Sequence, residues 1–386
     1  MECSSISQMK YAQFSLRLQG KVSSKRIPIS GTLEITSNCN LKCVHCYVVP
    51  NKRGNELSTK EVFRLFDELA VEGCLWLLIT GGEPLVRPDF EKIYVRAKEK
   101  GFLITLFTNA TLISPRIADL LQEFPPFSIE TSIYGASKET YERVTKVKDS
   151  FEKFLHGVNL LLERSLPLKL KTMILNFNKQ ELPAIKAFAN DIKADFRFDP
   201  VLIPMTDGNK DLYQYRLSPE EVVELDINDR KRMKAWQEFW PRCKGAPKGD
   251  SLFLCAAGKN SFHIDASGML TACEMYRPEK VDLREKAFKE GWFEFIPGVI
   301  SQKRTKNTKC SKCDKIALCG ECPGWSYMEF GDNESPVEHL CKIAHLRDEL
   351  FFSRPLTDAE ALPLGRGKQG FSSPKYIKSR LKMGKT

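Results

Sequence analysis

Thr-Ser-Asn-Cys-Asn-Leu-Lys-Cys-Val-His-Cys-Tyr, residues 36–47, is the stretch that decides the fold of this 386-residue chain. Cys39, Cys43 and Cys46 follow a C-x3-C-x2-C spacing, which brings three thiolates within reach of one small object. A cubane iron–sulfur cluster usually binds through four cysteines, so three cysteines leave one iron open to an outside ligand. A zinc site is the alternative, but three cysteines without a nearby fourth make a poor tetrahedral site.

This cysteine spacing resembles that of the radical S-adenosylmethionine (SAM) superfamily. The resemblance implies a [4Fe-4S] cluster whose open iron binds the amino and carboxylate groups of SAM. It also implies that an electron from the cluster cleaves SAM to a 5′-deoxyadenosyl radical, and that a reductant such as flavodoxin or ferredoxin supplies this electron. His45 is expected to pack near the adenine of SAM, with general-base duty as the alternative.

Strands alternate with helices in the sequence that surrounds this loop. A capping box at Ser58 and Glu61 marks the start of one helix, and Ser114-Pro115 opens another. Such alternation predicts a parallel α/β sheet, and six units suggest a partial (β/α)6 barrel rather than a closed eight-fold one. The expected strands are residues 32–36, 75–79, 103–107, 127–133, 168–174 and 196–203.

The turn Gly81-Gly82-Glu83-Pro84 follows the second expected strand, at the end of a barrel where ligands gather. It resembles the GGEP turn of the same superfamily. The resemblance implies that the glycines let the backbone approach the amino end of SAM and that Glu83 steadies its ammonium group. An ordinary strand-to-helix turn is the alternative.

Three further residues are candidates for SAM binding. Asn109 and Ser132, at the ends of the third and fourth strands, match places where family members contact the SAM carboxylate or ribose. Arg143 resembles an arginine that often pairs with the SAM carboxylate. Alternatively, Asn109 and Ser132 are turn residues that hydrogen-bond their own backbone, and Arg143 occupies a solvated helix position.

A second group of seven cysteines occupies the C-terminal part of the chain. Their order resembles the SPASM extension of radical SAM enzymes, which carries two auxiliary iron–sulfur clusters, although the gap before Cys322 is x2 rather than the usual x3. The resemblance assigns Cys310, Cys313, Cys319 and Cys341 to the outer cluster, and Cys255, Cys273 and Cys322 to the inner one. With only three cysteines, the inner cluster would keep an open iron or recruit Cys243 as a fourth ligand. Structural zinc is the alternative for the paired C-x2-C motifs.

Glu274 directly follows Cys273 and is the candidate catalytic residue. Sulfatase-maturing relatives carry an acidic residue at this place as a proton acceptor. A carboxylate near an abstracted hydrogen could take the proton that is released when the substrate radical is oxidised. A surface glutamate in a loop is the alternative.

Composition restricts the compartment and the partners. The longest compact apolar run, Leu75–Ile79, is far too short to span a bilayer, and the first thirty residues lack a secretory signal. We therefore expect a cytoplasmic protein whose thirteen cysteines bind metal rather than form disulfides. The net charge of +10 includes a basic segment, 365–386, which reads first as a solvated tail, because no nucleic-acid-binding module accompanies it.

The whole sequence predicts a radical SAM/SPASM oxidoreductase that acts on a peptide or protein side chain. A small-molecule cofactor or metabolite precursor is the alternative substrate, and a non-catalytic metal-cluster protein that binds nucleic acid through its tail is the alternative class. The sequence does not fix the oligomeric state. The expected parts are an N-terminal extension (1–28), the partial barrel (29–205), linker helices (206–242), the SPASM domain (243–350) and the basic tail (351–386).

Overall fold

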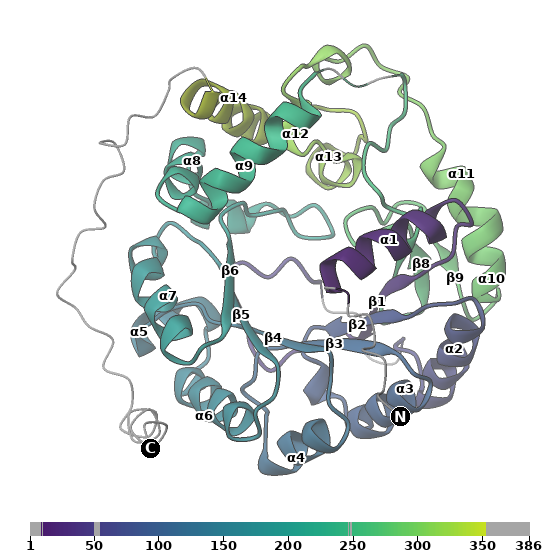
Figure 1. The fold of residues 1–386 in the computed structure, drawn as a ribbon, viewed down its shortest axis with the longest axis vertical. Coiled ribbons are helices and arrows are strands. Elements are labelled where there is room, and N and C mark those ends of the chain that lie inside the picture. Colours follow the sequence, from purple (N-terminus) through teal and green to yellow (C-terminus); the bar gives the residue numbers. More distant parts are fainter. Residues whose placement is uncertain (1–8, 10, 50–54, 246, 248, 353–386) are drawn as a thin grey trace, which may run out of the picture.

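Six parallel strands form the centre of the molecule (Figure 1). The computed structural model describes residues 9, 11–49, 55–245, 247 and 249–352. Each strand pairs in parallel with the next along the chain, which confirms the predicted partial (β/α)6 barrel. The strands are β1 (Ser30–Thr36), β2 (Trp76–Gly81), β3 (Leu103–Thr108), β4 (Ser128–Ser132), β5 (Leu168–Met173) and β6 (Asp195–Asp199).

Helices cover the outer face of this curved sheet (Figure 1). Apolar residues at helical spacing bury one side of each helix against the strands, as Leu65, Phe66 and Leu69 do in the first of them. The predicted capping box is present, since Ser58 and Glu61 exchange both hydrogen bonds. The covering helices are α2 (Thr59–Val71), α3 (Phe90–Glu99), α4 (Pro115–Glu123), α5 (Lys138–Thr145), α6 (Ser150–Glu163) and α7 (Leu182–Asp191).

The sheet does not end at β1. A four-residue strand, β7 (Ser261–Ile264), pairs in parallel with β1, and β8 (Met269–Thr271) and β9 (Val281–Asp282) continue the sheet in antiparallel fashion. The strand order is β6-β5-β4-β3-β2-β1-β7-β8-β9. The sequence analysis did not predict these three strands, because each is too short to show a period. The sheet therefore runs across the expected boundary between barrel and C-terminal domain.

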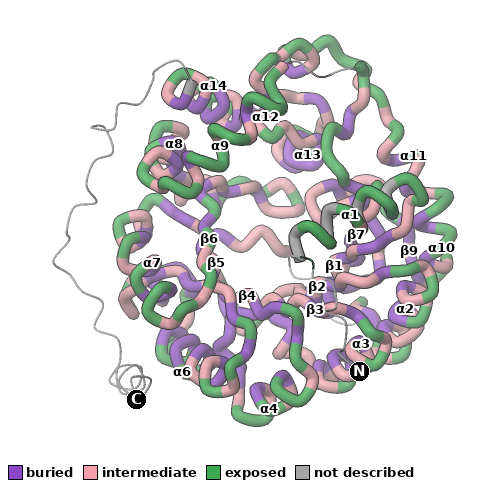
Figure 2. The backbone as a smooth tube through the Cα atoms, in the orientation of Figure 1, coloured by how far each residue is buried: buried purple, intermediate pink, exposed green. Residues whose placement is uncertain are grey.

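The remaining helices lie at the N-terminus and in the C-terminal half; in Figure 2, α9 is largely exposed and α13 largely buried. Residues 351 and 352 end the last helix, and the rest of the expected basic tail lies outside the described residues. None of the helices within the described ranges has the length and apolar character needed to cross a membrane. These helices are α1 (Tyr11–Ser23), α8 (Pro219–Ile227), α9 (Arg230–Cys243), α10 (Phe288–Glu290), α11 (Ile296–Ile300), α12 (Ile316–Cys319), α13 (Pro323–Phe330) and α14 (Glu338–Phe352).

A buried carboxylate joins three of these helices. Asp226 of α8 is fully buried and accepts hydrogen bonds from Arg232 of α9 at 2.7 Å and from Arg347 of α14 at 3.0 Å. Arg347 is itself buried and also donates to the carbonyl of Leu318 in α12. This ion-pair network ties the last helix to the expected linker.

Substitution Asp226→Ala is expected to lower the free energy of unfolding by about 3–5 kcal/mol, because it leaves Arg347 buried without its anionic partner. Urea unfolding followed by circular dichroism measures the change. Asp119→Ala is the matched control, since Asp119 pairs with Arg164 at the surface and should contribute at most about 1 kcal/mol. A loss at Asp226 no larger than the loss at Asp119 would contradict the prediction.

Candidate functional site

A cavity of about 440 Å³ opens at the carboxyl ends of the barrel strands. This volume lies within the range of small-molecule binding sites. Residues from the ends of strands β2 to β6 line it, together with the loop after β1 and Glu274 and Met275 from the C-terminal half. The predicted site residues that line it are Cys39, Cys43, His45, Cys46, Gly81, Gly82, Asn109, Ser132 and Glu274.

The three cysteines of the first loop face this cavity. The backbone N–H of Leu41 and the Asn109 amide both donate to Cys39 Sγ, at 3.4 and 3.8 Å. Burial raises the pKa of the Cys39 thiol to about 11, and the neighbouring groups Glu83 and Cys46 add to the shift. A trio of thiolates in this place therefore needs a positively charged partner.

The spacing of these sulfurs does not match a single tetrahedral metal ion. A single tetrahedral zinc ion would hold its sulfur ligands about 3.8 Å apart, given a Zn–S bond of about 2.3 Å. Within the described ranges, the three Sγ atoms do not all lie within 4.8 Å of one another. The three cysteines therefore do not form a ready-made closed zinc site.

The Gly81-Gly82 turn packs directly against the backbone of the cysteine loop. Gly81 has a φ of +144°, and a Cβ atom there would lie 2.0 Å from the carbonyl oxygen of Thr36. A Cβ atom on Gly82 would lie 2.3 Å from the carbonyl oxygen of Asn38. Glycine is needed at both positions because the turn and the loop touch. The same turn also faces the cavity, where the sequence analysis expects SAM.

Glu83 and Pro84 are buried behind this turn and do not line the cavity. The Glu83 carboxylate accepts hydrogen bonds from the backbone N–H of Asn109 at 2.6 Å and from the Thr108 hydroxyl at 2.8 Å. Burial raises the pKa of Glu83 to about 7. In this structure the carboxylate joins the ends of β2 and β3, and the expected contact between Glu83 and the ammonium of SAM stays a prediction.

Asn109 and Ser132 line the cavity as expected, whereas Arg143 does not. Asn109 also bonds Asn40 of the cysteine loop at 2.9 Å. Arg143 is exposed on α5, and its guanidinium lies 4.1 Å from the centroid of the Phe177 ring. Arg143 is not among the residues that line the cavity, and its expected pairing with the SAM carboxylate stays a prediction.

His45 is buried in the cavity wall, where its ring meets the edge of Tyr134 at a centroid distance of 4.8 Å. Its Nδ1 atom is buried and has no hydrogen-bond partner among the described residues. Burial lowers the pKa of His45 to about 4, so that the imidazole is neutral near pH 7. A neutral ring with a free nitrogen suits the expected packing against an adenine.

Glu274 reaches the same cavity from the C-terminal half of the chain. Its carboxylate accepts a hydrogen bond from the hydroxyl of Tyr47, which directly follows the third cysteine. Arg277 fixes the local backbone by donating to the Glu274 carbonyl at 2.8 Å, and it also donates to buried Glu34 of β1 at 2.7 Å. The predicted proton acceptor is thus held between the two cysteine-rich parts of the chain.

Sequence reasoning missed several polar residues of this cavity: Tyr47, Lys171, Thr172, Arg197 and Asp199. Tyr47 is the last residue of the quoted stretch, so its place beside Cys46 was the available signal. Lys171 lies in the alternating stretch Leu168-Lys169-Leu170-Lys171, which looks like a strand with a solvent face. In a barrel the second face of the strand points inward instead.

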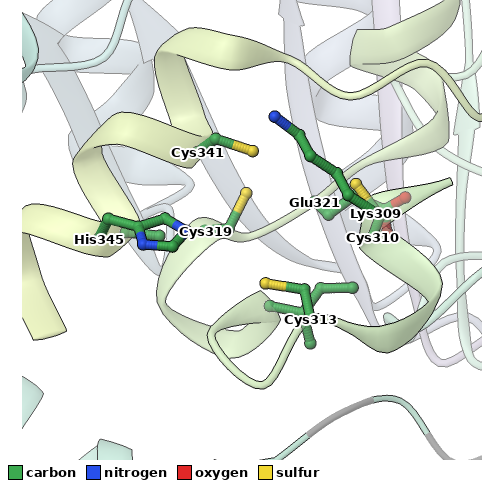
Figure 3. Close-up of a pocket in the computed structure, with 9 residues that line it drawn as sticks. Lys309, Cys310, Cys313, Cys319, Glu321, Cys341 and His345 are labelled. Carbon is green, nitrogen blue, oxygen red and sulfur yellow. The ribbon is translucent and has the colours of Figure 1, made fainter.

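The four cysteines of the expected outer set surround one space. Figure 3 shows the sulfur atoms of Cys310, Cys313, Cys319 and Cys341 facing it, with Lys309 and His345 beside them. The Cys319 thiol donates to Cys341, which keeps the pKa of Cys341 below its usual range. The arrangement brings together the four cysteines of the predicted outer set.

The three cysteines of the expected inner set also lie close together. Burial raises the pKa of Cys273 to about 11, and the nearby thiols of Cys322 and Cys255 raise it further. Cys243 ends α9, and the N–H of Gly245 just beyond it donates to the carbonyl of Asp314, next to the outer set. Of the two alternatives for the inner set, this position of Cys243 favours the open iron over recruitment of Cys243.

The fold and the cysteine loop define an enzyme of the radical SAM class, which uses a [4Fe-4S] cluster and SAM. The chain belongs to the radical SAM superfamily: the family model described as "Radical SAM superfamily" matches residues 33–189. Its cysteine-rich C-terminal part is of the SPASM type. The alternative of a non-catalytic metal-cluster protein is thereby set aside.

The chain is similar to several named proteins. It is 30% identical over 258 residues to the mycofactocin maturase MftC of Mycobacterium ulcerans, covering 64% of this chain and 68% of that one. It is 26% identical to the AdoMet-dependent heme synthase of Methanosarcina barkeri, covering 78% of this chain and 92% of that one. In fold it resembles Streptococcus suis SuiB bound to the precursor peptide SuiA, with a TM-score of 0.67, 16% identity and coverage of 88% and 84%.

Substitution Gly82→Ala is expected to reduce the iron bound by the first cysteine loop, because the new Cβ would displace the backbone at Asn38. Overpacking of this kind costs about 1–3 kcal/mol. Iron content after anaerobic reconstitution measures the effect. Gly298→Ala is the control, since no atom lies within 4 Å of its Cβ position. A Gly82→Ala protein with the full iron content would show that the close contact is not needed.

Proposed function

We propose that this radical SAM enzyme removes hydrogen from a side chain of a peptide or protein. The observation that carries the proposal is the shared cavity, in which Glu274 of the C-terminal half faces the three cysteines of the barrel loop. The similarity to a mycofactocin maturase and to SuiB bound to its precursor peptide SuiA supports a peptide substrate.

Each group at the cavity has a role in this proposal. Cys39, Cys43 and Cys46 hold the cluster, and the Gly81-Gly82 turn, Asn109, Ser132 and His45 position SAM. When bound, the cluster and SAM supply a radical that can take a hydrogen atom from an unactivated carbon. Glu274 then accepts the proton that leaves when the substrate radical is oxidised, and Tyr47 orients its carboxylate.

The SPASM-type cysteines complete the proposed assignment. Cys310, Cys313, Cys319 and Cys341 hold an outer cluster, and Cys255, Cys273 and Cys322 hold an inner cluster with an open position. These groups would carry away the electron that the substrate radical loses. A flavodoxin or ferredoxin is the proposed reductant of the first cluster.

A small-molecule substrate is the second candidate. The heme synthase of Methanosarcina barkeri, whose length the match covers almost completely, favours a tetrapyrrole precursor instead of a peptide. The two candidates share the cavity and differ in what enters it.

One experiment separates these two functions. The reconstituted enzyme is given SAM, dithionite and either a library of short peptides or iron-coproporphyrin III, and the products are followed by mass spectrometry. Peptide modification predicts 5′-deoxyadenosine together with a peptide that has lost hydrogen. A tetrapyrrole product with an unchanged peptide would overturn the peptide assignment.

A further inference from the structure

One row of residues crosses the cavity wall on three neighbouring strands. Lys171 of β5 is in register with Ser132 of β4 on one side and with Arg197 of β6 on the other. All three side chains line the cavity. The row therefore presents two cations to whatever the cavity holds.

Lys171 is the cation of this row that lacks an anionic partner. Its ammonium lies 2.9 Å from the centroid of the Phe107 ring and forms no ion pair among the described residues. Arg197, by contrast, donates to Glu130 at 2.8 Å, and the carboxylate of Glu274 is engaged by Tyr47. Burial lowers the pKa of Lys171 to about 7, with nearby Glu130 and Glu274 opposing the shift and Arg197 adding to it.

A cationic side chain in such a place gains most from an anion brought by a ligand. An unpaired ammonium that is removed from water is unfavourable, whereas a charge-assisted hydrogen bond to a carboxylate compensates for the lost hydration. The aromatic ring beneath the ammonium contributes a weaker attraction. A carboxylate placed next to Lys171 would therefore be bound favourably.

The position of the row favours the substrate, and not SAM, as the source of this anion. The residues expected to hold SAM belong to the loops after β1 to β4, and Ser132 is the last of them. Lys171 and Arg197 lie on β5 and β6, and Glu274 is near enough to Lys171 to affect its pKa. The unpaired cation is therefore on the side of the proposed proton acceptor.

We propose that Lys171, with Arg197 beside it, forms an anion subsite that binds a carboxylate of the substrate. The inference deepens the proposed function, on which it rests for the entry of substrate into this cavity. It names the substrate class: a molecule that carries a carboxylate close to the carbon that loses hydrogen. An acidic peptide residue and a tetrapyrrole carboxylate offer the same chemistry.

Binding measurements with two matched pairs of probes test the subsite. One pair is the blocked peptides acetyl-Gly-Glu-Gly-amide and acetyl-Gly-Gln-Gly-amide, and the other is coproporphyrin III and its tetraamide. Calorimetry uses the full-length, cluster-loaded protein with SAM present. We expect the wild type to prefer the carboxylate member of one pair by about ten-fold or more, and the preferred pair identifies the source of the carboxylate.

Three variants assign this preference to the side chain. Lys171→Met should abolish it, and Lys171→Arg should retain it because the charge remains. Lys169→Met should also retain it, since Lys169 lies on the same strand but not in the cavity wall. No preference in either pair, or a preference that survives Lys171→Met, would overturn the subsite, and so would a Lys171→Met protein that loses affinity for SAM.

Failure of the subsite and failure of the peptide assignment give different results. If only the coproporphyrin pair shows a preference that depends on Lys171, the subsite stands and the peptide assignment fails. If a modified peptide forms equally well with wild type and Lys171→Met, the peptide assignment stands and the subsite fails.

Discussion

Substitution Cys43→Ala should reduce the formation of 5′-deoxyadenosine from SAM to the level of the enzyme-free reaction. Cys39→Ala and Cys46→Ala should have the same effect, because all three thiols face the one cavity that the Gly82 turn and His45 also line. Without one ligand the cluster is not held, and the electron that cleaves SAM has no source. Chromatography of the anaerobic reaction with dithionite measures the product.

Iron content gives an independent readout of the same change. Three cubane clusters correspond to about twelve irons per chain, and loss of the first one should leave about eight. Cys74→Ala is the matched control, since Cys74 is buried in the core and bonds the Trp76 carbonyl at 3.6 Å, away from the cavity. A Cys43→Ala protein that keeps half of the wild-type rate would refute the assignment.

Substitution Glu274→Gln should lower the rate of substrate modification by about 10²- to 10⁴-fold, the range of a lost general base. The amide keeps the shape of the side chain but cannot accept the proton. Cleavage of SAM should continue, because the cysteine loop is intact. The ratio of 5′-deoxyadenosine to modified substrate should therefore rise steeply, and mass spectrometry of both products measures it.

Two further variants separate proton transfer from simple misplacement. Tyr47→Phe removes the hydroxyl that donates to Glu274 and should produce a smaller loss in the same direction. Glu279→Gln is the control. Glu279 accepts a hydrogen bond from Tyr276 and does not line the cavity, so its replacement should leave the ratio of 5′-deoxyadenosine to modified substrate unchanged. A Glu274→Gln enzyme within ten-fold of wild type would exclude the proposed role.

Local signals explain why much of the fold is predictable from the sequence. The cysteine spacing, the capping box at Ser58 and the alternation of apolar residues each report on a few neighbouring residues, and six strands follow from them. β7 is different, since Ser261–Ile264 is too short to carry a pattern and its pairing with β1 spans more than two hundred residues. Its place depends on the assembled sheet.

The candidate site was predictable where the motif itself faces the cavity. Side-chain surroundings were less predictable: Glu83 accepts a hydrogen bond from the backbone of Asn109, and the Arg143 guanidinium lies over the Phe177 ring, so that neither residue lines the cavity. Lys171 was missed for the reverse reason. Its strand, β5, looks in sequence like a strand with one face in solvent, but β5 belongs to a curved sheet, and the polar face that carries Lys171 lines the cavity.

The pairing of β7 with β1 bears on how this enzyme can be divided. A chain cut before Ser261 would expose an open edge on the strand that leads into the cysteine loop, and exposed edges invite self-association. We therefore expect the isolated N-terminal half to aggregate instead of acting as a minimal SAM-cleaving enzyme. Any homologue that dispensed with the C-terminal cysteines would have to retain or replace this short protective strand.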